Sequence, residues 1–471
     1  EMLEGFSNKG MITVALLFLV SEGIRQSGTL GQVIKKLLPQ GKTTVFKAQL
    51  RILPSVAFIS AFLNNTPVVV IFAPIIKHWA KSVNLPATKF LIPLSYVTIL
   101  GGICTLIGTS TNLVVHGMIL EAGFEGFSMF ELGKVGIFIA IAGIIYIFLF
   151  SKRLLPDARP DTAVPDEEVE EGEKLHRVEA VLGARFPGIN KKLKDFNFQR
   201  HYGAEVKEIK TRNGQRFVTN LDDVVLHEGD TLVVMADDTF IPTWGESSVF
   251  VLLTNGNEPD TTGKKKRWFA LLLLVLMIVG ATVGELPVTK EMFPDIKLDM
   301  FFFVSITTII MAWTNLFPAR KYTKYISWDI LITIACAFAI SKAMVNSGVA
   351  DSVAKFIIGL SDDYGPHVLL AMVFIITNLF TELITNNAAA ALAFPLALSI
   401  SAQLGVSPTP FFVVICMAAS ASFSTPIGYQ TNLIVQGIGN YKFTDFVRIG
   451  LPLNIITFLI SIILIPLIWN F

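Results

Sequence analysis

The sequence predicts an all-α polytopic membrane protein made of two inverted-topology repeats. Each repeat carries re-entrant helical hairpins and broken helices, and a small α+β cytoplasmic insert lies between the repeats. Hydrophobic residues make up 52% of the 471 residues and charged residues 16%, whereas soluble domains carry about 25% charge. Residues 383–441 and 449–471 contain no Asp, Glu, Lys or Arg, and a spanning helix needs about 20 mostly apolar residues. The third observation is an internal repeat that covers both halves of the chain.

The composition excludes several classes of function. A net charge of +1 indicates no nucleic-acid partner. Cys104, Cys336 and Cys416 lie inside apolar runs, which favours small buried residues over a disulfide framework or a metal cluster. The sequence has no Gly-x-Gly-x-x-Gly after a strand and no P-loop. We therefore expect neither an enzyme nor an organic cofactor.

One polar block, residues 152–266, interrupts the apolar segments. Basic residues flank it at 152–153 and 264–267, and basic residues beside membrane segments mark the cytoplasmic side. We therefore expect three parts: membrane repeat 1 (1–151), a cytoplasmic linker and domain (152–266, core 178–245) and membrane repeat 2 (267–471). The bilayer of the plasma (inner) membrane would surround the two repeats.

The polar block begins with an acidic run, residues 166–171, that is typical of a solvated tether. Residues 204–210 alternate with period two and predict a strand, and Asn213-Gly214 is a hairpin turn signal. Two further strands are expected at 224–226 and 231–235, on either side of a turn. The block therefore predicts a small α+β unit.

The internal repeat holds one register over much of the chain. Most matches lie 320 residues apart, and the adjacent Asn pairs match at a spacing of 322. The matching segments are 6–15 with 326–335, 111–113 with 431–433, and 64–65 with 386–387. Chance would not hold such a register, so we infer a duplication.

The topology follows from counting spans. With 366–402 as a re-entrant hairpin, the second repeat crosses five times from Arg267 and ends on the opposite side from the first. The copies are then inverted, as in many secondary transporters. The second repeat has two helices before Ile326, but only five residues precede Phe6. We expect about two more membrane segments upstream of Glu1, so the first repeat would be truncated at its N-terminus.

Two segments predict helical hairpins with polar tips. The first covers 51–79 with its tip at 63–67, and the second covers 366–403 with its tip at 384–388. Adjacent Asn residues in an uncharged run are costly unless protein, water or ligand satisfies them. Half-helix N-termini at a tip offer free N–H groups and a positive dipole end, which suit an anion. Helix caps or interhelical contacts are the alternative, and the repetition of the pair favours a site.

Two further segments predict broken helices, at 101–112 and 424–432. Gly, Pro, Ser and Thr at membrane depth free backbone carbonyls, which is tolerated where the backbone lines a cavity or binds an ion. Such carbonyls with Asn and hydroxyl oxygens form a hard-cation site without a carboxylate. A simple kink is the alternative, and repetition again favours the site.

Charge near the tips is sparse. No Lys or Arg is close in sequence to either tip, so an anion would depend on amide and hydroxyl donors, dipoles and co-bound sodium. Glu382 precedes the second tip, and at a spacing of 322 its counterpart is Ser60. It is a possible coupling acid that carries a proton or binds a cation, or it pairs with a neighbour or faces water.

At these residues the sequence resembles the divalent anion–sodium symporter (DASS) family, over most of the chain outside the insert. Its Ser-Asn-Thr tip signatures correspond to 64–66 and 385–387, and its Gly-Thr-x-x-Asn motif to 108–112, with 428–432 as a looser copy. The resemblance implies two or more Na⁺ ions flanking one substrate, a homodimer, and an elevator-type motion against a scaffold. The expected substrate-binding residues are Asn64, Asn65, Thr66, Ser110, Thr111, Thr385, Asn386, Asn387, Gln430 and Thr431; the expected sodium ligands are Asn65, Gly108, Asn112, Asn387, Gly428 and Asn432.

The chain departs from the family at both tips. The first has Asn where the family has Ser, and the second ends Asn-Asn-Ala without Thr. The insert resembles the C-terminal lobe of RCK (TrkA-C) domains, and family members with such inserts are commonly assigned to sulfate. We therefore expect a sodium-coupled symporter for a divalent anion, sulfate first.

Three alternatives stay open for transport. They are a di- or tricarboxylate symporter, an anion antiporter with Glu382 at its centre, and an RCK-gated channel. A channel would need a filter such as Thr-Val-Gly-Tyr-Gly, which the sequence lacks. The RCK-like domain could bind a regulatory ligand or aid dimerisation.

Overall fold

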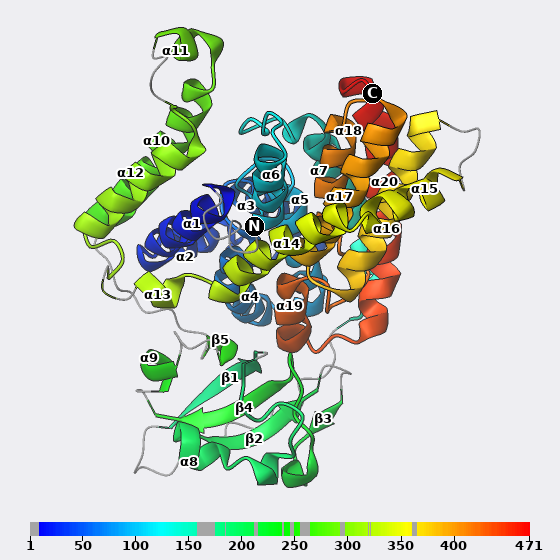
Figure 1. Cartoon of the computed structure of the whole chain (residues 1–471). Helices are drawn as coiled ribbons and strands as arrows, with labels where there is room; N and C mark the ends of the chain where they lie inside the picture. The colour runs from blue at the N-terminus through cyan, green and yellow to red at the C-terminus, as the bar shows by residue number, and fades with distance from the viewer. Residues whose placement is uncertain are drawn as a thin grey trace.

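The computed structural model describes residues 9–157, 175–183, 185–211, 215–237, 240–244, 249–254, 264–292, 297–318, 320, 322–359 and 365–471. Five of its helices are long and apolar enough to cross a membrane, and a bent pair (Ile330–Asn346 with Val349–Phe356, 73° apart) makes a sixth candidate. The predicted polytopic, all-α membrane fold with a small α+β insert is confirmed (Figure 1).

The first repeat contains seven α-helices among the described residues. They are α1 (Lys9–Gln26), α2 (Thr29–Leu37), α3 (Val45–Ser60), α4 (Asn65–Ser82), α5 (Leu91–Gly102), α6 (Ser110–Glu121) and α7 (Gly133–Leu154). Thr44 caps α3 because its hydroxyl accepts from the Lys47 amide. At the end of α7, the buried Lys89 ammonium donates to the Lys152 and Leu155 carbonyls, which suits the negative end of the helix dipole.

The insert is a five-stranded antiparallel sheet with short helices. Its elements are β1 (His176–Leu182), α8 (Phe198–Tyr202), β2 (Glu205–Lys210), β3 (Arg216–Phe217), β4 (Thr231–Ala236), α9 (Phe240–Trp244) and β5 (Phe250–Thr254), with strand order β3-β2-β4-β1-β5. The sheet extends beyond the expected core of 178–245. Its centre is apolar, with Phe186, Phe198 and Leu232 buried together.

Two of the three strands expected in the insert are present, as β2 and β4. The expected strand at 224–226 is wrong: Val225 makes only an isolated bridge to Lys192, and a 3₁₀ turn, Leu221–Asp223, leads into it. Val224 and Leu226 are buried in the apolar core of the insert, but they reach it from a loop. The Asn213-Gly214 turn lies outside the described residues, although the flanking β2 and β3 pair antiparallel.

The second repeat continues the helical pattern. Its helices are α10 (Lys264–Gly284), α11 (Pro287–Met292), α12 (Met300–Trp313), α13 (Tyr322–Tyr325), α14 (Trp328–Asn346), α15 (Val349–Gly359), α16 (Gly365–Leu383), α17 (Asn386–Leu404), α18 (Thr409–Ser420), α19 (Gln430–Gly439) and α20 (Phe443–Ile468). Helices α16 and α17 form the expected second hairpin, as α3 and α4 form the first. Both broken helices are also present, as α5 with α6 and α18 with α19.

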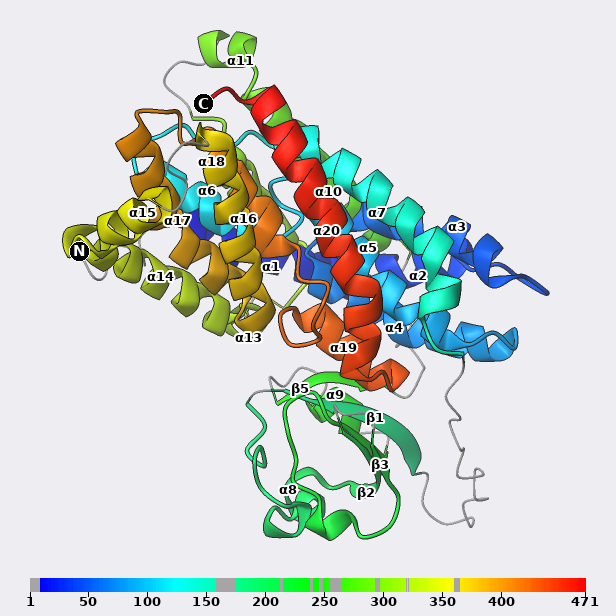
Figure 2. The ribbon, with the colours of Figure 1, turned by 90° about the vertical axis from the view of Figure 1, so that its right-hand side faces the viewer.

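The repeats pack in matching ways. Hairpin helix α3 packs on α5 and α7, and α16 packs on α18 and α20. The second hairpin helices cross over to the other repeat, so that α4 packs on α19 and α17 packs on α6. Helix α19 lies beside the insert, whereas α6 lies farther from it, in the upper half of the helical part (Figure 1). Figure 2 shows the same arrangement from the side. The equivalent helices α6 and α19 therefore lie in different halves of the helical part.

Candidate substrate and cation site

The first tip is held by a buried amide. Helix α3 ends at Ser60 and α4 begins at Asn65. The Asn65 Oδ1 atom accepts from Ser60 Oγ at 2.7 Å, and its Nδ2 donates to the Tyr429 hydroxyl at 2.6 Å. Asn65 is completely buried. Its carboxamide therefore binds its own hairpin and the broken helix of the other repeat at once.

The second tip repeats this geometry. Thr381 Oγ1 contacts Asn386 Oδ1 at 2.7 Å, as Ser60 contacts Asn65. Thr385 caps α17, since its hydroxyl accepts from the Ala388 amide. These equivalent pairs are 321 residues apart, so the expected spacing of 322 at the tips is wrong.

The corrected register changes one assignment. Asn65 corresponds to Asn386, and Glu382 takes the place of Ala61, not of Ser60. Hydrogen bonds support this, because Thr105 Oγ1 donates to the Ala61 carbonyl and Thr425 Oγ1 donates to the Glu382 carbonyl. Because each tip contains two adjacent Asn residues, the sequence alone does not show which Asn residues are equivalent in the two repeats.

The two breaks are closed by asparagine amides in the same way. Asn112 Nδ2 donates to the Thr105 carbonyl at 2.9 Å and, more weakly, to Gly102 at 3.5 Å. Asn432 Nδ2 donates to the carbonyls of Ser422 and Thr425 at 2.8 and 3.1 Å. Each amide thus gathers backbone oxygens of one break around itself.

Glycine is required at both breaks because the backbones approach closely. A Cβ on Gly108 would lie 2.5 Å from the Gly102 carbonyl oxygen and 2.9 Å from that of Ala61. A Cβ on Gly428 would collide with Ser422 Oγ and the Thr381 carbonyl. The loops therefore press directly against the hairpin tips, where carbonyls from both elements meet.

Each tip contacts the broken helix of the opposite repeat. Thr66 Oγ1 lies 3.4 Å from Gln430 Oε1. In the equivalent place, Asn387 Oδ1 accepts from Ser110 Oγ at 3.3 Å and Thr111 Oγ1 at 3.1 Å. Each tip therefore reaches the other repeat through the broken helix of that repeat.

Four helix N-termini converge at these contacts. Helices α4, α6, α17 and α19 begin at Asn65, Ser110, Asn386 and Gln430. The N-cap residues of α4, α6 and α19 make no side-chain cap hydrogen bond. The side chains of these N-cap residues therefore do not occupy the first amides of the three helices, which lie at the positive end of each helix dipole.

One contact joins equivalent residues of the two repeats. Thr109 Oγ1 and the Tyr429 hydroxyl lie 3.1 Å apart, and these residues are 320 positions apart in the sequence. Two equivalent positions can touch only at the pseudo-two-fold axis. The four helix N-termini therefore surround this axis.

The expected substrate residues divide into two groups by exposure. Buried ones already have partners: Asn65, Thr111, Asn386 and Asn387 as above, and Thr431, which accepts from Ser95 Oγ at 2.9 Å. Accessible ones are half-buried or exposed, and they are Asn64, Thr66, Ser110, Thr385 and Gln430. The accessible group is the one that can contact a ligand without first losing a buried hydrogen bond.

Sequence reasoning missed several residues of the site. Ser60, Thr381, Thr105 and Thr425 hold the tips and breaks in both repeats. Their pairing at 320 or 321 residues is a signal that a full alignment of the two halves would reveal. Tyr429 had no such signal, because its counterpart is Thr109.

We call each break asparagine, Asn112 or Asn432, together with the backbone carbonyls that its amide binds, an asparagine cage. The two cages differ in one respect. Asn432 Oδ1 accepts from Ser95 Oγ at 2.7 Å. Asn112 Oδ1 is buried and has no hydrogen-bond partner among the described residues. The counterpart of Ser95 is the fully buried Ile415, which has no hydroxyl to donate. The first cage therefore offers an unused oxygen to a cation.

Glu382 lies against the second break. Its carboxylate accepts from the Ser424 amide at 2.9 Å and from Asn454 Nδ2 at 2.8 Å, and Ser422 Oγ lies 3.5 Å away. In the described part of the chain, no Lys or Arg forms an ion pair with it. The Glu382 side chain is therefore held at the second break by neutral hydrogen-bond donors.

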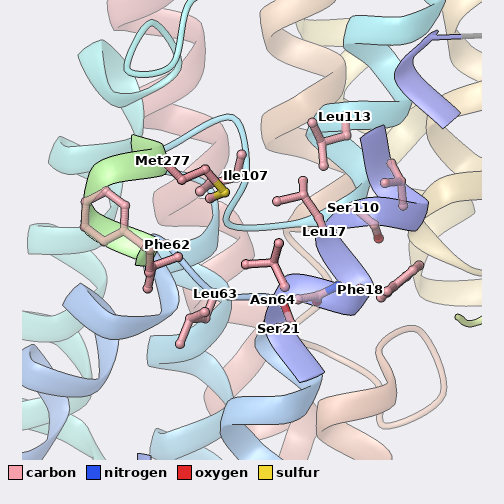
Figure 3. A pocket seen from close by; sticks show the side chains of 13 residues that line it. Leu17, Phe18, Ser21, Phe62, Leu63, Asn64, Ile107, Ser110, Leu113 and Met277 are labelled. Carbon is pink, nitrogen blue, oxygen red and sulfur yellow. The ribbon is translucent and has the colours of Figure 1, made fainter. Parts of the chain in front are cut away.

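A small cavity borders the first tip. It has a volume of about 20 Å³, room for about one water molecule. Leu17, Phe18 and Ser21 of α1 line one side, and the tip lines the other (Figure 3). Of the expected substrate residues, Asn64 and Ser110 reach it. Helices α1 and α10 thus cover the tip closely in this conformation.

The geometry can be compared with known proteins. The model of a family described as citrate transporter matches residues 1–406 and again residues 296–470. The chain belongs to this family. The assignment agrees with the DASS-type permease expected from the tips and breaks, and makes the protein an integral membrane transporter, not an enzyme.

Relatives of this citrate transporter family member extend over its whole length. An uncharacterized transporter of Synechocystis is 30% identical, covering 100% of this chain and 90% of the relative. A putative sulfur deprivation response regulator of Chlamydomonas reinhardtii is 28% identical over 98% of this chain and 93% of its own length. A probable sodium/sulfate cotransporter of the same alga is 33% identical over 59% of this chain and 31% of its own length.

Proposed function

We propose that this family member is a sodium-coupled symporter for a divalent anion, with sulfate as the first candidate. The observation that carries the proposal is the crossed arrangement of tips and breaks, which brings four helix N-termini together between two asparagine cages. The names of the similar Chlamydomonas cotransporters support the same pairing of ion and substrate.

An anion at this place would meet neutral side chains that can all donate hydrogen bonds. The accessible side chains are the amides and hydroxyls of Asn64, Thr66, Ser110, Thr385 and Gln430, with helix N-termini behind them. Sulfate is a full dianion at neutral pH and needs donors alone. Phosphate is partly protonated and would also require an acceptor, which the oxygens of the same amides and hydroxyls can supply. Sulfate is therefore placed first because of the names of the similar cotransporters.

Two Na⁺ ions would balance the charge of the dianion. The proposed ligands are the oxygens of Asn65, Asn112 and Gly108 at the first tip, and of Asn386, Asn432 and Gly428 at the second. Asn386 replaces the expected Asn387 because Asn386 is the equivalent of Asn65, whereas the Asn387 oxygen faces Ser110 and Thr111. The unpaired Asn112 Oδ1 supports the first site, because a buried acceptor without a partner is costly. Glu382 would strengthen cation binding at the second.

The remaining features of the proposal follow the family pattern. The transporter would work as a homodimer in the plasma membrane, with an elevator-type movement and the RCK-C-like insert on the cytoplasmic side. In this scheme the hairpins α3–α4 and α16–α17 and both broken helices form one moving body.

A second candidate is a sodium-coupled di- or tricarboxylate transporter, which the description of the matched family favours. Labelled sulfate or succinate would be added outside proteoliposomes that contain the purified protein. We expect sodium-dependent sulfate uptake that unlabelled sulfate suppresses. Succinate uptake that is indifferent to sulfate would reject the sulfate assignment, and uptake without sodium would reject coupling.

A third candidate, an anion antiporter, depends on Glu382. In the symporter reading, Glu382→Gln raises the half-saturating sodium concentration and leaves the pH profile unchanged. A loss of pH dependence in Glu382→Gln, with exchange that requires an anion on both sides, would favour the antiporter.

A further inference from the structure

The insert is docked on the membrane part, at two helices that lead to the site. The docking face of the insert consists of Val181, Gly229, Thr231 and Val251. Val181 is completely buried and belongs to the apolar core of the membrane part, against which Val251 also packs. Strand β1 packs on α19. The insert is therefore continuous with the transporter core.

The fit at α19 is close. A Cβ on Gly437 would lie 2.5 Å from Thr231 Oγ1 and 3.5 Å from Val181 Cγ2. A Cβ on Gly229 would lie 2.5 Å from Leu433 Cδ1. Both elements thus meet with glycine on one side of each contact, which allows the sheet to rest directly on the helix.

An ion pair makes a second contact, to α4. Both carboxylate oxygens of Glu179 accept from Lys77 Nζ at 2.9 Å. The two side chains are 21% and 15% exposed, and Lys210 Nζ lies 3.4 Å from Glu179. Burial alone would raise the pKa of Glu179, but the ammonium groups of Lys77 and Lys210 outweigh it and lower the pKa to about 2.

Both helices begin at the candidate site. Helix α4 begins at Asn65, and Lys77 lies about 18 Å along it at 1.5 Å per residue. Helix α19 begins at Gln430, and Gly437 lies about 10 Å along it. At their beginnings, the two helices are joined by Asn65 with Tyr429 and Thr66 with Gln430. At their far ends, the insert joins them.

We propose that the insert is a control element for the binding site. Its docking face holds the far ends of α4 and α19 in register, and through these helices it sets the apparent affinity for the anion. This inference rests on the proposed function only for the identity of the ligand. Loosening the docking face misaligns Asn65 and Gln430 relative to each other, and binding weakens while the membrane fold remains.

A size-compensation experiment tests the contact at α19. Gly437→Ala places a methyl group against Thr231 Oγ1, and Thr231→Ala removes that oxygen. Thr231 Oγ1 has no hydrogen-bond partner among the described residues, so Thr231→Ala alone costs little. In sodium-driven sulfate uptake, Gly437→Ala should raise the half-saturating sulfate concentration about fivefold or more, the lower end of usual coupling between sites. The double variant should return toward the wild-type value, with maximal rates little changed.

Lys77→Met provides a second, independent perturbation of the docking face. It should raise the half-saturating concentration in the same direction. Asp223→Asn is the matched control, because Asp223 forms exposed ion pairs with Lys192 and Lys194 on the insert and should have no effect. Thermal melting of each purified variant separates weakened binding from unfolding.

Two results would overturn the proposal. One is an unchanged half-saturating concentration in both Gly437→Ala and Lys77→Met in folded protein. The other is a Gly437→Ala defect that Thr231→Ala does not relieve, because the effect would then arise within α19. If the wild type takes up neither sulfate nor succinate, the proposed function fails. In that case, amide hydrogen exchange in α19 still tests whether the insert holds this helix. Lys77→Met should accelerate this exchange, and Asp223→Asn should not.

Discussion

Replacing Gly108 by alanine is the most direct perturbation of the first cation cage. The added Cβ would lie 2.5 Å from the Gly102 carbonyl oxygen and 2.9 Å from that of Ala61. Both neighbours are backbone atoms, so neither can rotate away. Ordinary contact would require the break to move by nearly 1 Å, and overpacking of this kind costs about 1–3 kcal/mol.

That cost should appear mainly in cation binding. The carbonyls of Gly102 and Thr105 are held by Asn112, and moving the loop separates them from Asn65. At 1.4 kcal/mol per factor of ten, the half-saturating sodium concentration should rise about 5- to 150-fold. Sodium-dependent anion uptake in proteoliposomes, measured over a range of sodium concentrations, gives this value.

A matched control is Gly359→Ala at the end of α15, where a Cβ meets no atom within 4 Å. It should leave sodium dependence and melting unchanged. A folded Gly108→Ala protein with wild-type sodium dependence would refute the idea that this break holds a cation.

Three further predictions concern other parts of the structure. Ile415→Ser supplies Asn112 Oδ1 with the kind of donor that Ser95 gives Asn432, and this donor would compete with sodium for the oxygen. The half-saturating sodium concentration should therefore rise about 3- to 10-fold, which is the value of one hydrogen bond. Ile415→Ala opens similar space without a donor and should not reproduce the rise. Lys89→Met leaves the Lys152 and Leu155 carbonyls without their buried donor and should destabilise the protein by about 2–4 kcal/mol, seen as a lower melting temperature with unchanged sodium dependence. The pKa of Glu179 falls from 4.5 to about 2 on folding, so its stabilising contribution is complete above pH 4.5 and is lost as the pH falls toward 2. Protease sensitivity of the insert should therefore rise as the pH falls from 4.5 toward 2. Equal sensitivity in the wild type and in Lys77→Met throughout that range would contradict the ion pair with Lys77.

Much of the architecture could be predicted because membrane segments and duplicated motifs leave strong signals. Uncharged runs indicated the hairpins, and Gly and Pro indicated the breaks. The register at the tips could not be fixed from the sequence, because each tip has two adjacent Asn residues and Asn65 can be aligned with either Asn386 or Asn387. Only the hydrogen bonds of Ser60 and Thr381 identify which Asn is equivalent.

The site was harder to predict than the fold. Contacts between repeats, such as Asn387 with Ser110, depend on how α17 packs on α6, and no local pattern encodes that packing. The difference between the cages depends on Ser95 and Ile415, each an ordinary residue of an apolar helix. The strand expected at 224–226 was wrong because Val224 and Leu226 are buried in the core of the insert from a loop, without joining the hydrogen-bond ladder of the sheet.

The contact between Thr109 and Tyr429 has a consequence for how the halves share one ligand. A tetrahedral ion centred on the pseudo-two-fold axis, beside the hydrogen bond between these two hydroxyls, would present equal edges to both copies of the duplicated unit. Any preference of the ion for one repeat would then come from the difference between Tyr429, a phenol, and Thr109, an aliphatic alcohol. At this position the two repeats are no longer chemically equivalent.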